Sequence, residues 1–289
     1  MQQTPQENFI IKIHGSATSG IIAAFTSYLA KQNCYISEMS QFDDPFSNTF
    51  FMRALFNFND EKNSNLDNFK SGMAQVAAQY DMQWELFSTR NPPKVVIMVS
   101  KFDHCLNDLL YRFKKGELDM EIVAVISNHL DARPIAEREG IRFIFLPITP
   151  ENKTQQEKEL MRIVEEEKVD LVVLARYMQI LSENLCKQLF GKAINIHHSF
   201  LPGFKGAKPY HQAFNRGVKL IGATAHYVTS DLDEGPIIEQ EVQRVDHHLF
   251  PDDLVSMGRD NETVVLARAV KYHLEHRIFL NGNRTVVFK

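Results

Sequence analysis

The feature that most constrains the fold is a series of short, nearly continuous apolar runs in the later two thirds of the chain. They are Lys94 to Ser100, Asp119 to Ser127, Ile141 to Leu146, Asp170 to Ala175 and Ala193 to His197. Helical segments separate the runs, and Glu151 to Lys168 is the clearest of them. Strands that are apolar on both sides and alternate with helices form a parallel sheet with both faces covered. We therefore predict an α/β fold that binds its ligand at the carboxyl ends of the strands.

The first 88 residues follow a different pattern, with the element order βαββαβ. The predicted strands are Phe9 to His14, Cys34 to Gln41, Asn48 to Phe56 and Gln83 to Ser88, and the predicted helices begin after Ser19 as N-cap and cover Leu66 to Gln79. This order builds a small antiparallel sheet with helices on one face, which is a ferredoxin-like α+β fold. Thr89 to Pro93 contains two consecutive prolines, which interrupt both helix and sheet. We therefore predict one domain over residues 1–88, a linker over 89–93 and a second domain over 94–289.

Composition excludes several classes of protein. The 289 residues carry a formal net charge of −4 without a long basic run, so nucleic acid is not an expected partner. The three cysteines form no CxxC pair and are too few for a disulfide framework. No run of about 18 apolar residues occurs, and Met1 to Pro5 lacks the pattern of a signal peptide. We expect a cytoplasmic protein that does not bind or span a membrane.

Three side chains of the second domain form a candidate site for acyl chemistry. Asn195 and His197 alternate at the end of a predicted strand, so their side chains leave on one face. Asp231 and Asp233 follow in a later turn, where Asp and Gly also have a purely local role. An amide N–H stabilises an oxyanion, a histidine carries protons near neutral pH, and an aspartate orients or deprotonates a nucleophile. The combination suits attack on a carbonyl carbon.

The other histidines have competing interpretations. His197 and His198 are adjacent on a strand and point to opposite faces, so a shared metal ion is disfavoured and no metal site is predicted. His247 and His248 lie in a polar stretch typical of a solvated loop. His226 lies in an apolar strand pattern, which suits a buried structural histidine as well as a ligand contact.

Three motifs occur along the second domain in a recognisable order: Asn195 to Pro202, Gly222 to Val228 and Asp233 to Ile238. In this order and spacing, residues from about 94 to 260 resemble the folate-dependent formyltransferase family. The resemblance implies a Rossmann-like domain with a mostly parallel sheet, in which Asn195, His197 and Asp233 are catalytic. It also implies that the folate lies between two groups of substrate-binding residues, Tyr177, Met178, Gln179, Ile180 and Leu181 on one side and His226, Val228, Thr229 and Asp231 on the other.

Further features extend the resemblance to nearly the whole chain: Ser100 to Leu106, His197 to Ser199, Gly206 to Ala213 and the βαββαβ unit. Together they resemble the formyltetrahydrofolate deformylases, a branch of the family with an N-terminal ACT domain. The resemblance implies that the front domain is regulatory and binds a small amino-acid effector, and that the chain forms a homo-oligomer. ACT domains often carry an Asp three residues before the glycine that opens the first helix, whereas Ala17 precedes Gly20 here. The resemblance is therefore stronger for the fold than for effector binding.

The loop after the first strand of the second domain departs from one member of the family, glycinamide ribonucleotide formyltransferase. That enzyme binds the acceptor's phosphate on a Gly- and Ser-rich loop, whereas Val99 to His104 contains no glycine and carries Asp103, which would repel a phosphate. This departure favours water as the acceptor. Whether Lys101, Asp103, His104 or Lys208 contacts the ligand is not decided by the sequence.

We therefore predict hydrolysis of 10-formyltetrahydrofolate to formate and tetrahydrofolate, which supplies both products to one-carbon and purine metabolism. No permanently bound cofactor is expected. Asp233 and His197 would activate the water, and Asn195 would stabilise the oxyanion. Two alternatives stay open: formyl transfer to an amine acceptor, and a non-catalytic folate or amino-acid sensor.

Overall fold

The computed structural model describes residues 7–60, 65–203 and 209–289. The chain divides into two compact units, and the second of them covers Pro92–Val287. The boundary therefore falls at the first proline of the predicted linker. Lys208 and the start of the Gly206 to Ala213 motif lie outside the described residues. Among the described helices, none combines the length and the hydropathy required to cross a bilayer.

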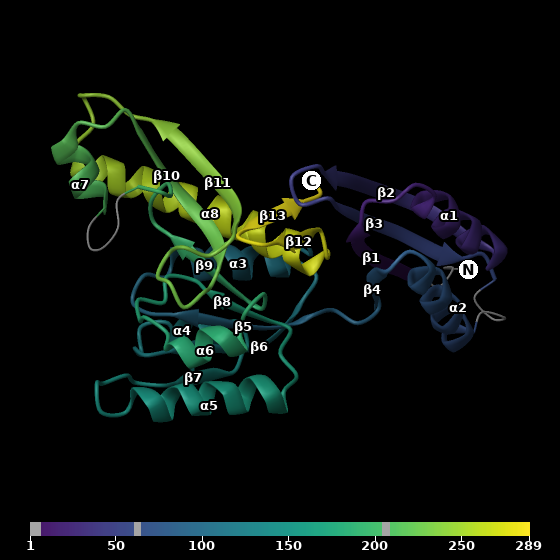
Figure 1. Ribbon diagram of the computed structural model, residues 1–289. Helices are drawn as coiled ribbons and strands as arrows, with labels where there is room; N and C mark the ends of the chain where they lie inside the picture. The colour runs from purple at the N-terminus through teal and green to yellow at the C-terminus, as the bar shows by residue number, and fades with distance from the viewer. Residues whose placement is uncertain (1–6, 61–64, 204–208) are drawn as a thin grey trace. The chain divides into compact units, whose positions relative to one another are not determined.

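The first unit is an antiparallel sheet with two helices (Figure 1). Its elements are β1 (Asn8–Ser16), α1 (Ile21–Lys31), β2 (Cys34–Asp44), β3 (Thr49–Phe58), α2 (Leu66–Gln79) and β4 (Met82–Ser88). The strand order is β2-β3-β1-β4, so the predicted βαββαβ arrangement is confirmed. Phe25 of α1 and Phe69 of α2 are fully buried and share one core with Phe56 of β3. The predicted N-cap Ser19 is wrong, because Gly20 caps α1 with a left-handed φ of 97° that suits a residue without a side chain.

The second unit is built on a seven-stranded sheet in the order β11-β10-β9-β8-β5-β6-β7. Its strands are β5 (Lys94–Val99), β6 (Glu121–Ser127), β7 (Phe143–Phe145), β8 (Leu171–Leu174), β9 (Ala193–His197), β10 (Leu220–Tyr227) and β11 (Ile237–Arg244). Its helices are α3 (His104–Lys114), α4 (Arg133–Arg138), α5 (Lys153–Glu166), α6 (Glu183–Gln188), α7 (Pro209–Arg216) and α8 (Pro251–Leu274), and β12 (Ile278–Asn281) and β13 (Arg284–Val287) form a hairpin. The five strands from β9 to β7 are parallel, whereas β10 is antiparallel to both β9 and β11. The predicted α/β fold with a mostly parallel sheet is confirmed.

Helices cover both faces of this sheet (Figure 1). Along β5, Val95 and Ile97 share a core with residues of α3 and α8, whereas Val96 and Met98 share another core with residues of α5 and α6. All four side chains are at most 2% exposed. Because successive strand residues point to opposite faces, a strand covered on both sides must be apolar throughout. This burial explains the continuous apolar runs of the sequence.

The order of the parallel strands reverses between β5 and β8. From β5 the chain adds β6 and β7 on one side, and then crosses to add β8 and β9 on the other. Open α/β sheets bind ligands at the carboxyl ends of the strands, most often at such a switch point. Asn195 and His197 lie one strand further along, at the carboxyl end of β9.

Candidate active site

A cavity of about 310 Å³ is lined by residues at and beyond the carboxyl ends of β8, β9 and β10. This volume is in the range of small-molecule sites. Every predicted substrate-binding residue except one lines it: Tyr177, Met178, Gln179, Ile180, Leu181, His226, Val228 and Thr229. The exception is Asp231, which is exposed and whose carbonyl accepts hydrogen bonds from the Thr229 hydroxyl at 3.0 Å and the Glu234 N–H at 3.2 Å.

The three predicted catalytic residues meet at this cavity, together with His226. Asn195 and His197 alternate on β9, and antiparallel pairing places His226 of β10 directly opposite Asn195. Such cross-strand neighbours have side chains within contact distance. The amide nitrogen of Asn195 accordingly lies 3.2 Å from Nε2 of His226.

Asp233 reaches both imidazoles from the loop between β10 and β11. Its Oδ1 lies 3.2 Å from Nδ1 of His197 and 3.6 Å from Nε2 of His226. The loop folds back tightly along β10, because a Cβ on Gly235 would lie only 1.7 Å from the carbonyl oxygen of Tyr227. Glycine at this position therefore lets Asp233 approach the histidines.

The partners of each ring indicate where its hydrogens lie. Nδ1 of His226 is 2.9 Å from the carbonyl oxygen of Tyr227, and a carbonyl only accepts, so Nδ1 carries hydrogen. His197 has Asp233 at Nδ1 and the hydroxyl of Ser199 at Nε2, 2.8 Å away. A neutral His197 therefore donates from Nδ1 to the carboxylate and accepts at Nε2 from Ser199. Each ring is therefore held on one side by a group outside the cavity lining, His197 by Ser199 and His226 by the carbonyl of Tyr227.

Charges around the site set the ionisation of two groups. Burial would raise the pKa of Asp233, but hydrogen bonds and charges from His197 and His226 outweigh it and hold the pKa well below its usual range. Burial, followed by the charge of Arg176, lowers the pKa of His198 to about 4. At neutral pH the site thus holds an ionised carboxylate and a neutral His198.

Sequence reasoning missed four residues that the structure places in or next to the site. Arg176 and His198 line the cavity, and Ser199 contacts His197. Glu262 lies behind Arg176 and is 1% exposed. The sequence does contain a signal for Glu262. It follows Leu254 and Gly258 at four-residue spacing, so it lies on the same buried face of the helix. A carboxylate on a buried helix face indicates a buried partner.

Two groups of described residues have the side-chain types of metal ligands: Asp246 with His247 and His248, and His104 with Cys105 and Glu262. The first group is exposed in a loop, where such clusters are common without an ion. The second is buried but lacks a usable thiolate, because burial raises the pKa of Cys105 well above its usual value. Neither group is assigned as a metal site.

Comparisons with known proteins agree with the geometry of this site. A formyl transferase family model matches residues 93–270. A protein of Corynebacterium sp. (strain P-1) named formyltetrahydrofolate deformylase is 51% identical over 270 residues, which are 93% of this chain and 94% of that protein. The crystal structure of formyltetrahydrofolate deformylase from Burkholderia mallei ATCC 23344 has a TM-score of 0.93 at 50% identity and covers 99% of this chain and 100% of that one.

The second unit also has more distant neighbours with another name. Phosphoribosylglycinamide formyltransferase from Anaplasma phagocytophilum has a TM-score of 0.62 at 31% identity and covers 69% of this chain and 96% of that one. The family model matches more than half of the chain, and the more similar relatives match nearly all of it. The chain therefore belongs to the formyl transferase family, among the proteins named formyltetrahydrofolate deformylase.

Proposed function

We propose that the second unit hydrolyses 10-formyltetrahydrofolate to formate and tetrahydrofolate. The proposal rests on one observation: Asn195, His197 and Asp233 line the same cavity. The names of the relatives support the same substrate and reaction. Both products would then be available to one-carbon and purine metabolism.

The cavity offers apolar surface for a flat aromatic ring. Met178, Ile180 and Leu232 line it and are 50%, 62% and 56% exposed without a ligand. Covering such side chains contributes about 25 cal/mol for each Å² of apolar surface removed from water. We assign the pterin to this apolar part and the formyl group to the end that holds Asn195.

Water attacks the formyl carbon while the site takes up a proton. The ionised Asp233 orients the water, and the proton is shared by the coupled pair of Asp233 and His197. Asp233 also balances the positive charge of a protonated His197. Ser199 keeps the ring in place from the other side, through its contact with Nε2.

Asn195 stabilises the tetrahedral intermediate by donating an amide N–H to the oxyanion. This amide lies 3.2 Å from Nε2 of His226, which holds it at the cavity. The carbon–N10 bond then breaks, N10 takes the proton from the Asp233 and His197 pair, and formate leaves. Loss of one such donor typically lowers the rate by about 10²- to 10³-fold.

The proposal is tested by measuring formate release from 10-formyltetrahydrofolate with no acceptor present. Asn195→Ala, His197→Ala and Asp233→Ala should each lose most turnover and still bind the folate. Asp246→Ala, which removes an exposed aspartate from a distant loop, is the control and should turn over normally. Near-normal release by any one of the three variants would contradict its assigned role.

Formyl transfer to an amine is the second candidate, and the likeness to the Anaplasma formyltransferase favours it. The same assay separates the two, because a transferase releases no formate without its acceptor. The exposed ends of Met178 and Ile180 serve either reaction, so substrate binding alone does not distinguish them.

We propose further that residues 1–88 form an ACT-like regulatory domain, that 89–93 is a linker and that 94–289 is the catalytic domain. The βαββαβ order and the strand order of the first unit support this assignment. A small amino acid is the proposed effector, and the formate assay repeated with individual amino acids tests it. Assembly as a homo-oligomer, action in the cytoplasm and turnover without a permanently bound cofactor belong to the same proposal.

A further inference from the structure

Backbone and side-chain groups that follow β5, β6 and β8 are hydrogen-bonded to one another at the switch point of the sheet. The N–H of Ser100, which follows β5, donates to the carbonyl of Arg176, which follows β8, at 3.2 Å. The Ser100 hydroxyl accepts from the Met178 N–H at 2.9 Å and donates to Asn128 beyond β6 at 2.7 Å. The segments that follow three neighbouring strands are thus tied together where the fold would most readily admit a ligand.

Arg176 extends from this point and is 8% exposed. Its Nε lies 3.4 Å from Oε2 of Glu262, and its guanidinium carbon lies 5.2 Å from the centre of the Phe102 ring. Among the described residues, Nε and Nη1 have no hydrogen-bond partner. Arg176 also lines the cavity that holds Asn195 and Asp233. Arg176 therefore belongs both to the switch point, through its carbonyl, and to the lining of the cavity.

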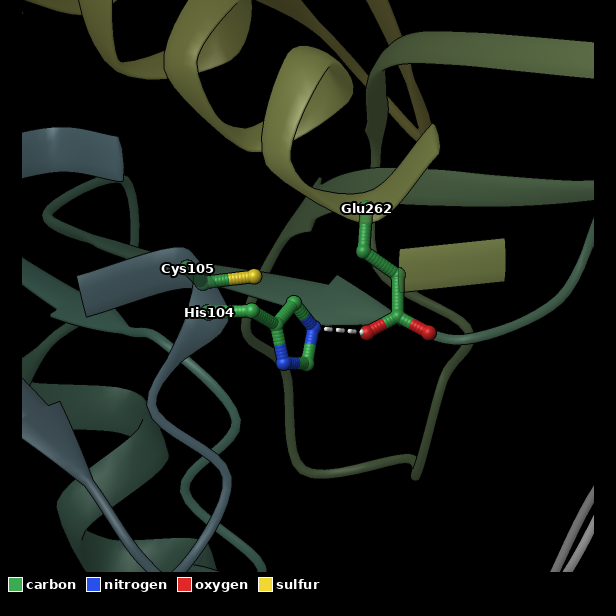
Figure 2. A group of neighbouring side chains, drawn as sticks. All are labelled: His104, Cys105 and Glu262. Atoms are coloured by element: carbon green, nitrogen blue, oxygen red, sulfur yellow. Dashed lines mark hydrogen bonds and ion pairs between the residues drawn. The ribbon is translucent and has the colours of Figure 1, made fainter. Parts of the chain in front are cut away.

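Glu262 holds Arg176 as part of a buried charged network. Its carboxylate lies 2.7 Å from Nε2 of His104 and accepts a hydrogen bond from the Tyr210 hydroxyl at 2.9 Å (Figure 2 shows His104 pointing at this carboxylate). Burial would raise the pKa of Glu262, but His104, Arg176 and Tyr210 outweigh it and lower the pKa. With His104, Tyr210 and the guanidinium of Arg176 around it, the carboxylate is already paired and is not a vacant metal ligand.

The backbone of Arg176 is unusual as well. Most residues other than glycine that have a positive φ in the described ranges lie where this is routine: Asn33, Asp81, Lys168 and His276 follow helix C-caps, and Asn48 lies in the turn between β2 and β3. The other two, Arg176 at 64° and Asp233 at 58°, both line the cavity. A residue with a side chain is strained in the left-handed region, so stability alone favours glycine at position 176.

We propose that Arg176, held by Glu262 and covered by Phe102, is a specificity-determining residue that closes the switch point against amine acceptors and leaves water to attack the formyl carbon. The inference rests on the proposed hydrolysis and explains its acceptor. Water needs no site of its own, so it is selected by excluding larger nucleophiles.

Opening the switch point would allow a second reaction at the same carbon. An amine that enters beside Asn195 attacks with its lone pair, and a carbon–nitrogen bond forms. The carbon–N10 bond then breaks, and N10 takes the proton that the amine loses. The products are a formamide and tetrahydrofolate, in place of formate and tetrahydrofolate.

Arg176→Gly is the direct test, because it removes the side chain and suits the backbone φ of 64°. Wild-type and variant full-length chains are incubated with 10-formyltetrahydrofolate and glycinamide, and mass spectrometry measures formylglycinamide against formate. We expect the ratio of formylglycinamide to formate to rise by about tenfold or more, since a change of 1.4 kcal/mol between two competing routes is tenfold. Phe102→Ala should give a smaller rise, because it uncovers Arg176 and leaves the guanidinium in place.

Lys168→Gly is the control for the backbone change, because it also replaces a cation at positive φ with glycine, but at an exposed position after α5. It should behave as the wild type. If both Arg176→Gly and Phe102→Ala still give formate alone at high glycinamide, the proposal is overturned. It is overturned also if folded Arg176→Gly binds folate but loses turnover, because Arg176 would then serve hydrolysis itself. Failure of the wild type to release formate without an acceptor would instead overturn the proposed function.

Discussion

Replacing Glu262 with alanine should strongly destabilise the second unit. The side chain is 1% exposed, and its loss leaves the buried guanidinium of Arg176 without a counter-charge and His104 and Tyr210 without their acceptor. Removing one partner of a buried ion pair costs about 3–5 kcal/mol. For a unit of this size, that loss corresponds to a fall in melting temperature of roughly 6–20 °C.

Thermal and urea unfolding of the full chain measure this effect, with the transition of the second unit followed by calorimetry. Arg268→Ala is a matched control on the same helix, because its ion pair with Glu241 is 2.8 Å long but 47% and 39% exposed. An exposed pair contributes at most about 1 kcal/mol. The double change Glu262→Ala with Arg176→Gly should recover part of the loss, since no unpaired charge then stays buried. Equal effects of Glu262→Ala and Arg268→Ala would refute the reasoning.

Three other changes act on neighbouring contacts. Ser199→Ala removes the hydroxyl 2.8 Å from Nε2 of His197. Loss of about one hydrogen bond should lower kcat by roughly five- to tenfold with little change in KM. Steady-state kinetics measures both constants, and Ser199→Thr should restore kcat. His198→Gln should flatten the dependence of stability on pH between about 4 and 6.5. The pKa of His198 is lowered to about 4 in the folded chain, so the unfolded chain binds more protons in this window and the wild type loses stability as pH falls. Denaturation midpoints measured across this pH range would show the difference. Gly258→Ala would place a Cβ 2.0 Å from the Tyr210 ring and should destabilise the second unit by about 1–3 kcal/mol in calorimetry, so an unchanged melting temperature would contradict the close packing.

Local patterns in the sequence predicted the elements and half of the site. The apolar run from Ala193 to His197 is the strand β9 with the same bounds, because a strand buried on both faces leaves a continuous signal. The alternation of Asn195 and His197 also placed both side chains at one cavity. Such predictions succeed where a two-residue period or a helical period fixes the direction of a side chain.

The other half of the site depends on pairing that no local pattern contains. The strand pattern by itself left His226 undecided between a structural and a ligand-contacting role, and it was the family resemblance that made it a predicted substrate-binding residue. The register of β10 against β9 places it opposite Asn195. Arg176 and Glu262 are 86 positions apart in the chain, yet they lie 3.4 Å from each other in the fold. Neither has a neighbour in sequence that predicts the other, so the charged network is visible only once the fold has been assembled.

The two kinds of relative suggest where acceptor choice is decided. The fold of this chain is shared by a solved deformylase that is 50% identical to it and by a solved formyltransferase that is 31% identical to it. The sheet alone therefore does not choose between water and an amine as the nucleophile. A hydrolase gains nothing from binding water tightly, and it gains specificity from any rigid group that keeps amines out. A buried ion pair adds little to stability. It does fix geometry here, because His104 and Tyr210 hold the Glu262 carboxylate that lies 3.4 Å from Nε of Arg176. Within the described part of the chain, Nε and Nη1 of Arg176 lack hydrogen-bond partners, and its backbone is left-handed. Both features cost stability, and the choice of nucleophile explains why this position keeps an arginine that takes no part in the proton transfers.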